Sequence, residues 1–131
     1  MMKIGEVADH ARVSLRTLRH YDTIGLLPPS GRSDGGFRLY TETDYQRLET
    51  IRGMTALDWS LEQVTEVMRI LTELEAPQTT SRRHALLRDL ARYAAEAQRQ
   101  RLELAEKLQR ADRFIATLRS RDGGTGDAAV A

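Results

Sequence analysis

The sequence predicts a mostly α-helical protein, in which a small winged helix-turn-helix domain is followed by one long coiled-coil helix. Three observations predict this fold. Two short segments with helical apolar spacing lie close together near the N-terminus, and a turn-rich segment with a short alternating run follows them. Residues 81–121 then contain neither Pro nor Gly and keep a heptad repeat of apolar residues throughout.

Two short helices joined by a tight turn are expected first. The leading helix has one apolar face, which consists of Ile4, Val7, Ala8 and Ala11. Ser14 is a favoured N-cap for the second helix, and Gly25 with the following Pro28 ends it. Only a few residues around Arg12 separate the two helices, which is typical of a helix-turn-helix. In that motif the second helix enters the major groove of DNA, led by its N-terminal residues.

A hairpin and two further helices are expected next. Residues 30–36 have the composition of a flexible turn, and residues 37–40 alternate in the manner of a short strand, so this stretch predicts a wing. Two capping boxes, each of which begins a helix, are Thr41 to Asp44 and Ser60 to Gln63. Helices this short are not stable alone in water, so we expect them to pack together.

The domain boundaries follow from breaks in these patterns. Residues 1–75 are expected to form the winged helix-turn-helix DNA-binding domain, and residues 76–80, Ala-Pro-Gln-Thr-Thr, a linker. Residues 81–121 form the predicted coiled-coil helix, and the Gly-rich residues 122–131 a disordered tail.

The long helix carries the strongest periodic signal in the chain. Its seam runs in steps of three and four residues through Leu87, Leu90, Ala94, Ala97, Arg101, Leu104, Leu108, Ala111, Ile115 and Leu118. A helix of that length is about 60 Å long and cannot bury its whole seam against so small a domain. The seam therefore predicts a partner chain, and Arg101 is its one polar position.

The local charge of the chain, rather than its net charge, indicates what kind of molecule it binds. The whole chain carries a formal net charge of +1, but residues 12–40 contain five arginines against only Asp22 and Asp34. Such a cluster is either a solvated surface or a surface for a phosphate backbone, and contact with nucleic acid is made through one face. Arg16 and Arg19 lie on the capped second helix and Arg38 lies on the strand of the wing, an order that favours DNA.

Composition excludes several other classes of protein. The chain has no cysteine, and its three histidines lie far apart, so no metal site is predicted. No apolar run approaches the ~20 residues that span a bilayer, and the N-terminus lacks a signal-peptide core, so we expect a cytoplasmic protein without a membrane partner. No nucleophile-base pair or Gly-rich phosphate loop indicates an enzyme, and no cofactor is predicted.

Several motifs together resemble the MerR family of bacterial transcription regulators. They are Ile4-Gly5-Glu6-Val7-Ala8, Val13-Ser14, Thr17-Leu18-Arg19-His20-Tyr21-Asp22, Gly25-Leu26-Leu27-Pro28, Gly36-Phe37-Arg38-Leu39-Tyr40, Asp44 and Leu57-Asp58-Trp59-Ser60-Leu61-Glu62-Gln63-Val64. The resemblance covers residues 3–75. It implies a homodimer joined by an antiparallel coiled coil and bound to a pseudo-palindromic operator in double-stranded promoter DNA. It also implies that the protein bends and untwists the promoter spacer, so that RNA polymerase aligns both promoter elements.

The resemblance also implies a DNA-contacting set, namely Ser14, Arg16, Thr17, Arg19, His20, Tyr21, Arg32, Arg38 and Tyr40. Arg16 or Thr17 is expected nearest the bases, with Tyr21, Arg38 and Arg32 on phosphates. Phosphate contacts set the register but carry no sequence information directly. Two alternatives remain: Tyr21 belongs to the core, and Tyr40 with Phe37 packs within the wing. Asp58 departs from the glycine common in the family, and it tolerates a left-handed turn.

Other functions remain open at this stage. An excisionase-type architectural DNA-binding protein is the main alternative, and the long dimer helix argues against it. A coiled-coil adaptor that binds only proteins would leave the arrangement of Arg16, Arg19 and Arg38 unexplained. A small-molecule effector of unknown identity is a further hypothesis, with a site near Trp59, Met68, His84 or Tyr93.

Overall fold

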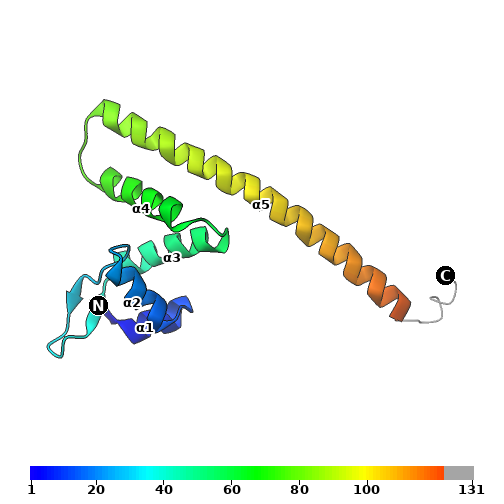
Figure 1. Cartoon of the computed structure of the whole chain (residues 1–131), viewed down its shortest axis with the longest axis horizontal. Helices are drawn as coiled ribbons and strands as arrows, with labels where there is room; N and C mark the ends of the chain where they lie inside the picture. The colour runs from blue at the N-terminus through cyan, green and yellow to red at the C-terminus, as the bar shows by residue number, and fades with distance from the viewer. Residues whose placement is uncertain (123–131) are drawn as a thin grey trace. The chain divides into compact units, whose positions relative to one another are not determined.

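The structure is a computed structural model, and it describes residues 1–122 (Figure 1). These residues form five α-helices and one three-stranded sheet, in the order β1 (Met2–Lys3), α1 (Ile4–Ala11), α2 (Leu15–Thr23), β2 (Gly31–Arg32), β3 (Arg38–Tyr40), α3 (Glu42–Ala56), α4 (Leu61–Glu75) and α5 (Thr80–Asp122). The mostly α-helical fold with a wing and one long helix is therefore confirmed.

Contacts divide the chain into two units, residues 1–90 and the residues from 91 onward. The first eleven residues of α5 belong to the first unit, although the helix itself is continuous from Thr80. The boundaries expected at residues 75 and 80 coincide with the end of α4 and the start of α5, and as domain boundaries they stay predictions. The predicted tail lies outside the described residues, except for Asp122, which ends α5.

The three predicted helix caps are confirmed, because each depends only on neighbouring residues. The Ser14 hydroxyl accepts a hydrogen bond from the Thr17 N–H at 3.0 Å. At the start of α3, the Thr41 hydroxyl accepts from the Asp44 N–H. At the start of α4, Ser60 and Gln63 cap each other in the same reciprocal way.

Replacing the cap of α2 should therefore destabilise the first unit. Ser14→Ala is expected to lower the free energy of unfolding by ~1 kcal/mol, because the Thr17 N–H loses its acceptor. Urea denaturation measures the change. Ser81→Ala, an exposed serine in the first turn of α5, is the control and should change stability by less than about 0.5 kcal/mol. Equal effects of the two substitutions would contradict a capping role for Ser14.

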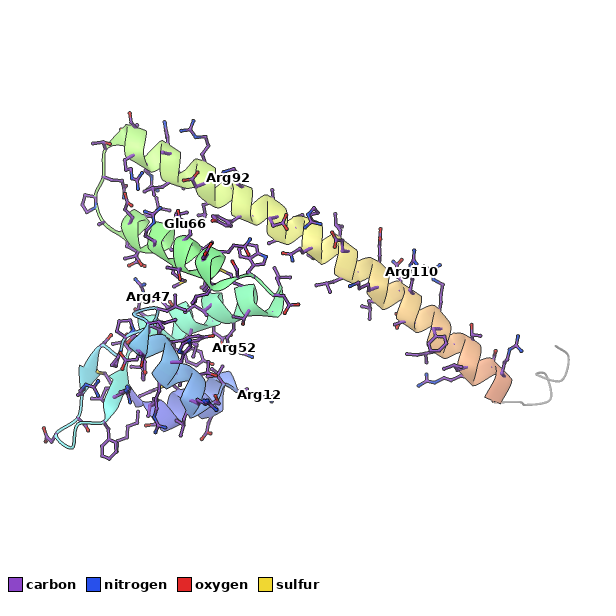
Figure 2. All side chains as sticks on the ribbon, in the orientation of Figure 1. Arg12, Arg47, Arg52, Glu66, Arg92 and Arg110 are labelled. Atoms are coloured by element: carbon purple, nitrogen blue, oxygen red, sulfur yellow. The ribbon has the colours of Figure 1, made fainter. Side chains whose placement is uncertain are left out.

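The turn between α1 and α2 is as short as the sequence predicts. Arg12, labelled in Figure 2, has a left-handed backbone with φ of 56° and ends α1. Its N–H and that of Val13 both donate to the Ala8 carbonyl, which closes the turn. Ala11 and Leu18 on either side of this turn are fully buried, so the two helices pack closely. This is the predicted helix-turn-helix.

The wing is a hairpin on a sheet of order β1-β3-β2, with antiparallel pairing throughout. Arg32 on β2 lies directly opposite Arg38 on β3. Gly36, with φ of +82°, provides the left-handed residue of the connecting turn. Strand β1 was not predicted, since two residues cannot show an alternating pattern; it pairs Met2 with Tyr40.

Helix α4 is held from two sides within the first unit. Arg47 on α3, labelled in Figure 2, donates to Glu75 and Thr72 on α4 at 2.9 Å each. On its other side, Arg82 of α5 binds Glu73 of α4 at 2.5 Å. The hydrogen bond from Arg82 lowers the pKa of the Glu73 carboxyl. The start of α5 is thereby attached to α4.

Leu86 follows Arg82 by one helical turn on the same face of α5, and only 1% of it is exposed. The sequence pattern missed this residue, because the predicted seam begins at its neighbour Leu87. Leu87 is 41% exposed, which leaves it available to another chain. The first turns of α5 thus present one apolar face to their own unit and another to the solvent.

Candidate nucleic-acid interface

The outer face of α2 carries the first group of predicted DNA-contacting residues. Arg16, Arg19 and His20 are exposed and follow one another at helical spacing, so they share one face. Leu18 on the opposite face is fully buried. Within residues 1–122 neither Arg16 nor Arg19 forms an ion pair. Their guanidinium groups therefore keep all their donors for an external anion.

Ser14 and Thr17 lie at the N-terminal end of the same helix, but their hydroxyl groups are engaged with each other. The two oxygens are 2.8 Å apart, and the Ser14 oxygen also accepts the Thr17 N–H. Thr17 is half-buried, whereas Arg16 is exposed. Of the two residues expected nearest the bases, Arg16 has the freer side chain.

Tyr21 is half-buried, so its ring lies partly in the core and partly at the surface. Burial raises the pKa of its hydroxyl group, and its ring lies 6.3 Å from that of His20. Its backbone carbonyl accepts the N–H groups of Leu26 and Leu27, which closes the turn after α2. The structure thus leaves both a core role and a phosphate contact open for Tyr21.

The two wing arginines are paired with a carboxylate on α2. The Nε atom of Arg38 donates to Oδ2 of Asp22 at 2.7 Å. A terminal nitrogen of Arg32 lies 3.8 Å from the same oxygen. Sequence reasoning counted Asp22 as a charge within the arginine-rich stretch and as part of a family motif, but did not pair it with the wing. The structure brings Arg32 and Arg38 together at the C-terminal end of α2.

Tyr40 is misplaced in the predicted DNA-contacting set. Its side chain is 0% exposed, and its hydroxyl oxygen has no hydrogen-bond partner within residues 1–122. Burial raises the pKa of this hydroxyl, and the negative charge of Asp22 raises it further. The ring packs in the core, because Arg38 and Tyr40 share the face of β3 that turns towards the helices. Phe37, expected to pack within the wing, is instead 62% exposed.

The part of α5 beyond residue 90 exposes many apolar side chains. Large exposed side chains on the predicted seam are Leu104, Leu108, Ile115 and Leu118, and Leu102 and Phe114 are exposed beside it. Arg101 is exposed as well. Figure 2 shows side chains, including that of Arg110, projecting from the helix along this part. A row of exposed large apolar side chains along one helix is typical of an interaction site.

The remaining sequence predictions concern membrane helices, metal ligands, an effector site and the backbone at Asp58. No helix in residues 1–122 is long and apolar enough to cross a membrane, and no group of metal-binding side chains gathers within those residues. Of the residues suggested for an effector, Met68 is buried and His84 is exposed. The effector stays a hypothesis. Asp58 adopts the left-handed conformation that the sequence suggested, with φ of 58°.

Comparison with protein families gives a match over residues 2–70 to the model described as MerR HTH family regulatory protein. The HTH-type transcriptional regulator ZntR of Escherichia coli (strain K12) is 43% identical over 75 residues, which cover 57% of this chain and 53% of ZntR. The HTH-type transcriptional activator mta of Bacillus subtilis (strain 168) is 36% identical over 126 residues, covering 93% of this chain and 42% of mta. The chain thus spans about half the length of these curated relatives.

Solved structures extend the likeness to the long helix. MtaN, the N-terminus of the Bacillus subtilis multidrug transporter activator, is 32% identical, with a TM-score of 0.54 over 90% of this chain and 94% of that one. HiNmlR, a MerR family regulator lacking the sensor domain, shares the fold at 24% identity, with a TM-score of 0.64 over 92% of this chain and 91% of that one. The family match covers the helix-turn-helix, the wing, α3 and most of α4. The chain therefore belongs to the MerR family of helix-turn-helix regulatory proteins.

Proposed function

We propose that the protein is a homodimeric transcription regulator that binds a pseudo-palindromic operator in promoter DNA. The observation that carries the proposal is the exposed face of α2, where the side chains of Arg16 and Arg19 form no ion pair within residues 1–122. The relatives ZntR and mta are both named as transcription regulators. The excisionase-type alternative finds no support among the relatives named above.

At each half-site, α2 enters the major groove and the wing lies beside it. Arg16, near the N-terminus of α2, reaches a base edge, where arginine binds guanine O6 and N7 in a bidentate manner. Arg19 and His20, further along the same face, contact phosphates. Arg38 and Arg32 add phosphate contacts from the wing, and Ser14 and Thr17 hold the N-terminal turn of α2 in place.

Two copies associate through α5 in an antiparallel coiled coil. The large seam side chains Leu104, Leu108, Ile115 and Leu118 are exposed in the single chain, and their burial against a second copy stabilises the dimer. Arg101 is the polar seam position, which costs stability but sets register. Glu96 and Glu103 both bind Arg99 on their own helix, so the helix surface beside Arg101 already carries an ion-pair network. Residues 76–79 link this helix to the DNA-binding domain.

The dimer acts on the promoter by deforming it. Bending and untwisting the spacer costs on the order of 1–6 kcal/mol, which contacts from two half-sites repay. RNA polymerase on the same promoter then meets both promoter elements in alignment. We place this activity in the cytoplasm and assign it no cofactor, metal or catalytic residue.

Selection from random DNA tests the proposal. The full chain is incubated with a pool of random duplexes, and the bound sequences are enriched and read. We expect an inverted repeat among the enriched sequences. When the DNA upstream of the protein's own gene is footprinted, the protected sequence should match that repeat and lie between two promoter elements. A gel assay with circularly permuted fragments should show a bend. Absence of any enriched sequence would refute the proposal, and a footprint inside an attachment site would favour the architectural protein.

Substitutions on α2 should separate base contacts from phosphate contacts. Arg19→Ala is expected to lower the slope of log Kobs against log salt by about one, equally for operator and random DNA. Arg16→Ala should cost ~1–3 kcal/mol at the operator and relax the preference at one base pair. Titrations over a range of salt concentrations measure both. Arg110→Ala, on an exposed part of α5, is the control and should change neither quantity. An unchanged slope for Arg19→Ala would remove that residue from the interface.

A further inference from the structure

One carboxylate in the first unit holds two guanidinium groups of the wing. Asp22 lies in the last turn of α2, and Arg32 and Arg38 lie opposite each other on the two strands of the hairpin. The separations from Asp22 Oδ2 are 2.7 Å for Arg38 and 3.8 Å for Arg32. The side chain of Asp22 is 18% exposed, that of Arg38 is 27% exposed and that of Arg32 is 52% exposed. The carboxylate therefore lies beneath the two arginines.

This arrangement has one positive charge in excess and spare donors. Two guanidinium groups face one carboxylate, and each guanidinium carries five N–H donors. Arg38 uses its Nε–H on Asp22, and Arg32 uses one further nitrogen on the Gly36 carbonyl at 3.2 Å. The remaining donors can bind one DNA phosphate without breaking the pair that orients them.

The same contact ties the wing to the recognition helix. Arg19, on the exposed face, precedes Asp22 by three residues in α2. A wing arginine bonded to Asp22 therefore stays at a set distance from the residues that enter the groove. Without the carboxylate, Arg38 would be a long free side chain and Arg32 would be held only by the Gly36 carbonyl. Both side chains would then lose more rotamer freedom on binding and would meet phosphates in more positions.

We propose that Asp22 is a positioning residue for DNA recognition. It orients Arg32 and Arg38 for one phosphate of the half-site, and it lowers the charge that attracts DNA of any sequence. Asp22 thus lowers the affinity for random DNA and raises the preference for the operator. The inference rests on the proposed function, since it requires an operator that the chain prefers to random DNA.

Asp22→Asn in the full chain tests this role, because it removes the charge and keeps the shape. We expect binding to random duplex DNA to strengthen and its salt slope to steepen, because one negative charge is lost. We expect the ratio of operator affinity to random-DNA affinity to fall by roughly tenfold. A change of this size corresponds to the loss of one charge-assisted hydrogen bond. Asp34→Asn is the matched control. It makes the same charge change at the exposed Asp34 in the wing loop, which has no ion pair within residues 1–122.

The outcomes distinguish a positioning role of Asp22 from a general effect of its negative charge. If the two variants raise operator and random affinity alike, Asp22 acts only as a charge and the inference is overturned. Asp22→Glu keeps the charge with one more methylene, so it should retain the wild-type salt slope while its affinity ratio falls. It also serves as the deciding variant if circular dichroism shows that Asp22→Asn is unfolded; a wild-type ratio in Asp22→Glu would then overturn the inference. A wild-type chain that prefers no duplex refutes the proposed function, and this inference with it.

Discussion

A fragment that ends at Leu90 is expected to be a folded monomer that binds the operator 10²–10⁴-fold more weakly than the full chain. The fragment keeps the whole first unit, including the buried Leu86, but loses the part of the exposed apolar seam that lies beyond residue 90. In the dimer, binding of one half-site makes the second encounter intramolecular, at an effective concentration in the millimolar range. The monomer has no such advantage.

Sedimentation and operator binding measure the two parts of this expectation. A chain that ends at Asp122 is the matched control, because it retains all of α5 and should dimerise and bind as the full chain does. A fragment of residues 1–90 that is dimeric at micromolar concentration would show that the dimer element lies elsewhere. Full operator affinity from a monomer would remove the need for two half-sites.

Leu86→Ala is expected to lower the free energy of unfolding by about 2–5 kcal/mol, the usual cost of truncating a buried leucine. The side chain is 1% exposed, so its removal leaves a cavity at the start of α5. Leu87→Ala is the control, because Leu87 is 41% exposed and shares the same helical turn. Urea denaturation of the fragment of residues 1–90 compares the two variants without any contribution from dimerisation.

The expected loss for Leu87→Ala in that fragment is within about 0.5 kcal/mol. Equal losses from the two substitutions would mean that Leu86 is no more important to the first unit than its neighbour. In the full chain, Leu87→Ala should instead weaken the dimer, because Leu87 lies on the seam. The pair therefore distinguishes packing within one chain from packing between two chains.

Features that depend on neighbouring residues could be predicted from the sequence. The cap at Ser14 follows from the chemistry of serine just before a helix. The left-handed residue at Asp58 follows from the glycine common at this position in the family, whose conformation Asp tolerates. The pairing of Asp22 with Arg38 joins residues sixteen positions apart, and no local pattern indicates it. The burial of Tyr40 has the same cause, since it depends on which face of β3 turns towards the helices.

The long helix illustrates a different limit. A heptad pattern identifies residues that can pack against another helix, and it identified Leu87 and those that follow. It does not indicate that Arg82 in the first turn of α5 pairs with Glu73 on α4 of the same chain. Leu86 lies one turn after Arg82 on the same face of α5 and is buried within its own chain. Only the fold shows that this face is covered.

The ion pairs inside the first unit bear on the protein's response to salt. Glu73 lies 2.5 Å from Arg82, and Asp22 lies 2.7 Å from Arg38. The Debye length is ~10 Å at 0.1 M and ~8 Å at 0.15 M ionic strength, several times these separations. Screening at those concentrations removes only part of the attraction within each pair, while every counterion displaced from DNA contributes fully to the salt dependence. Salt should therefore release the DNA from a protein whose wing and α5 are still attached.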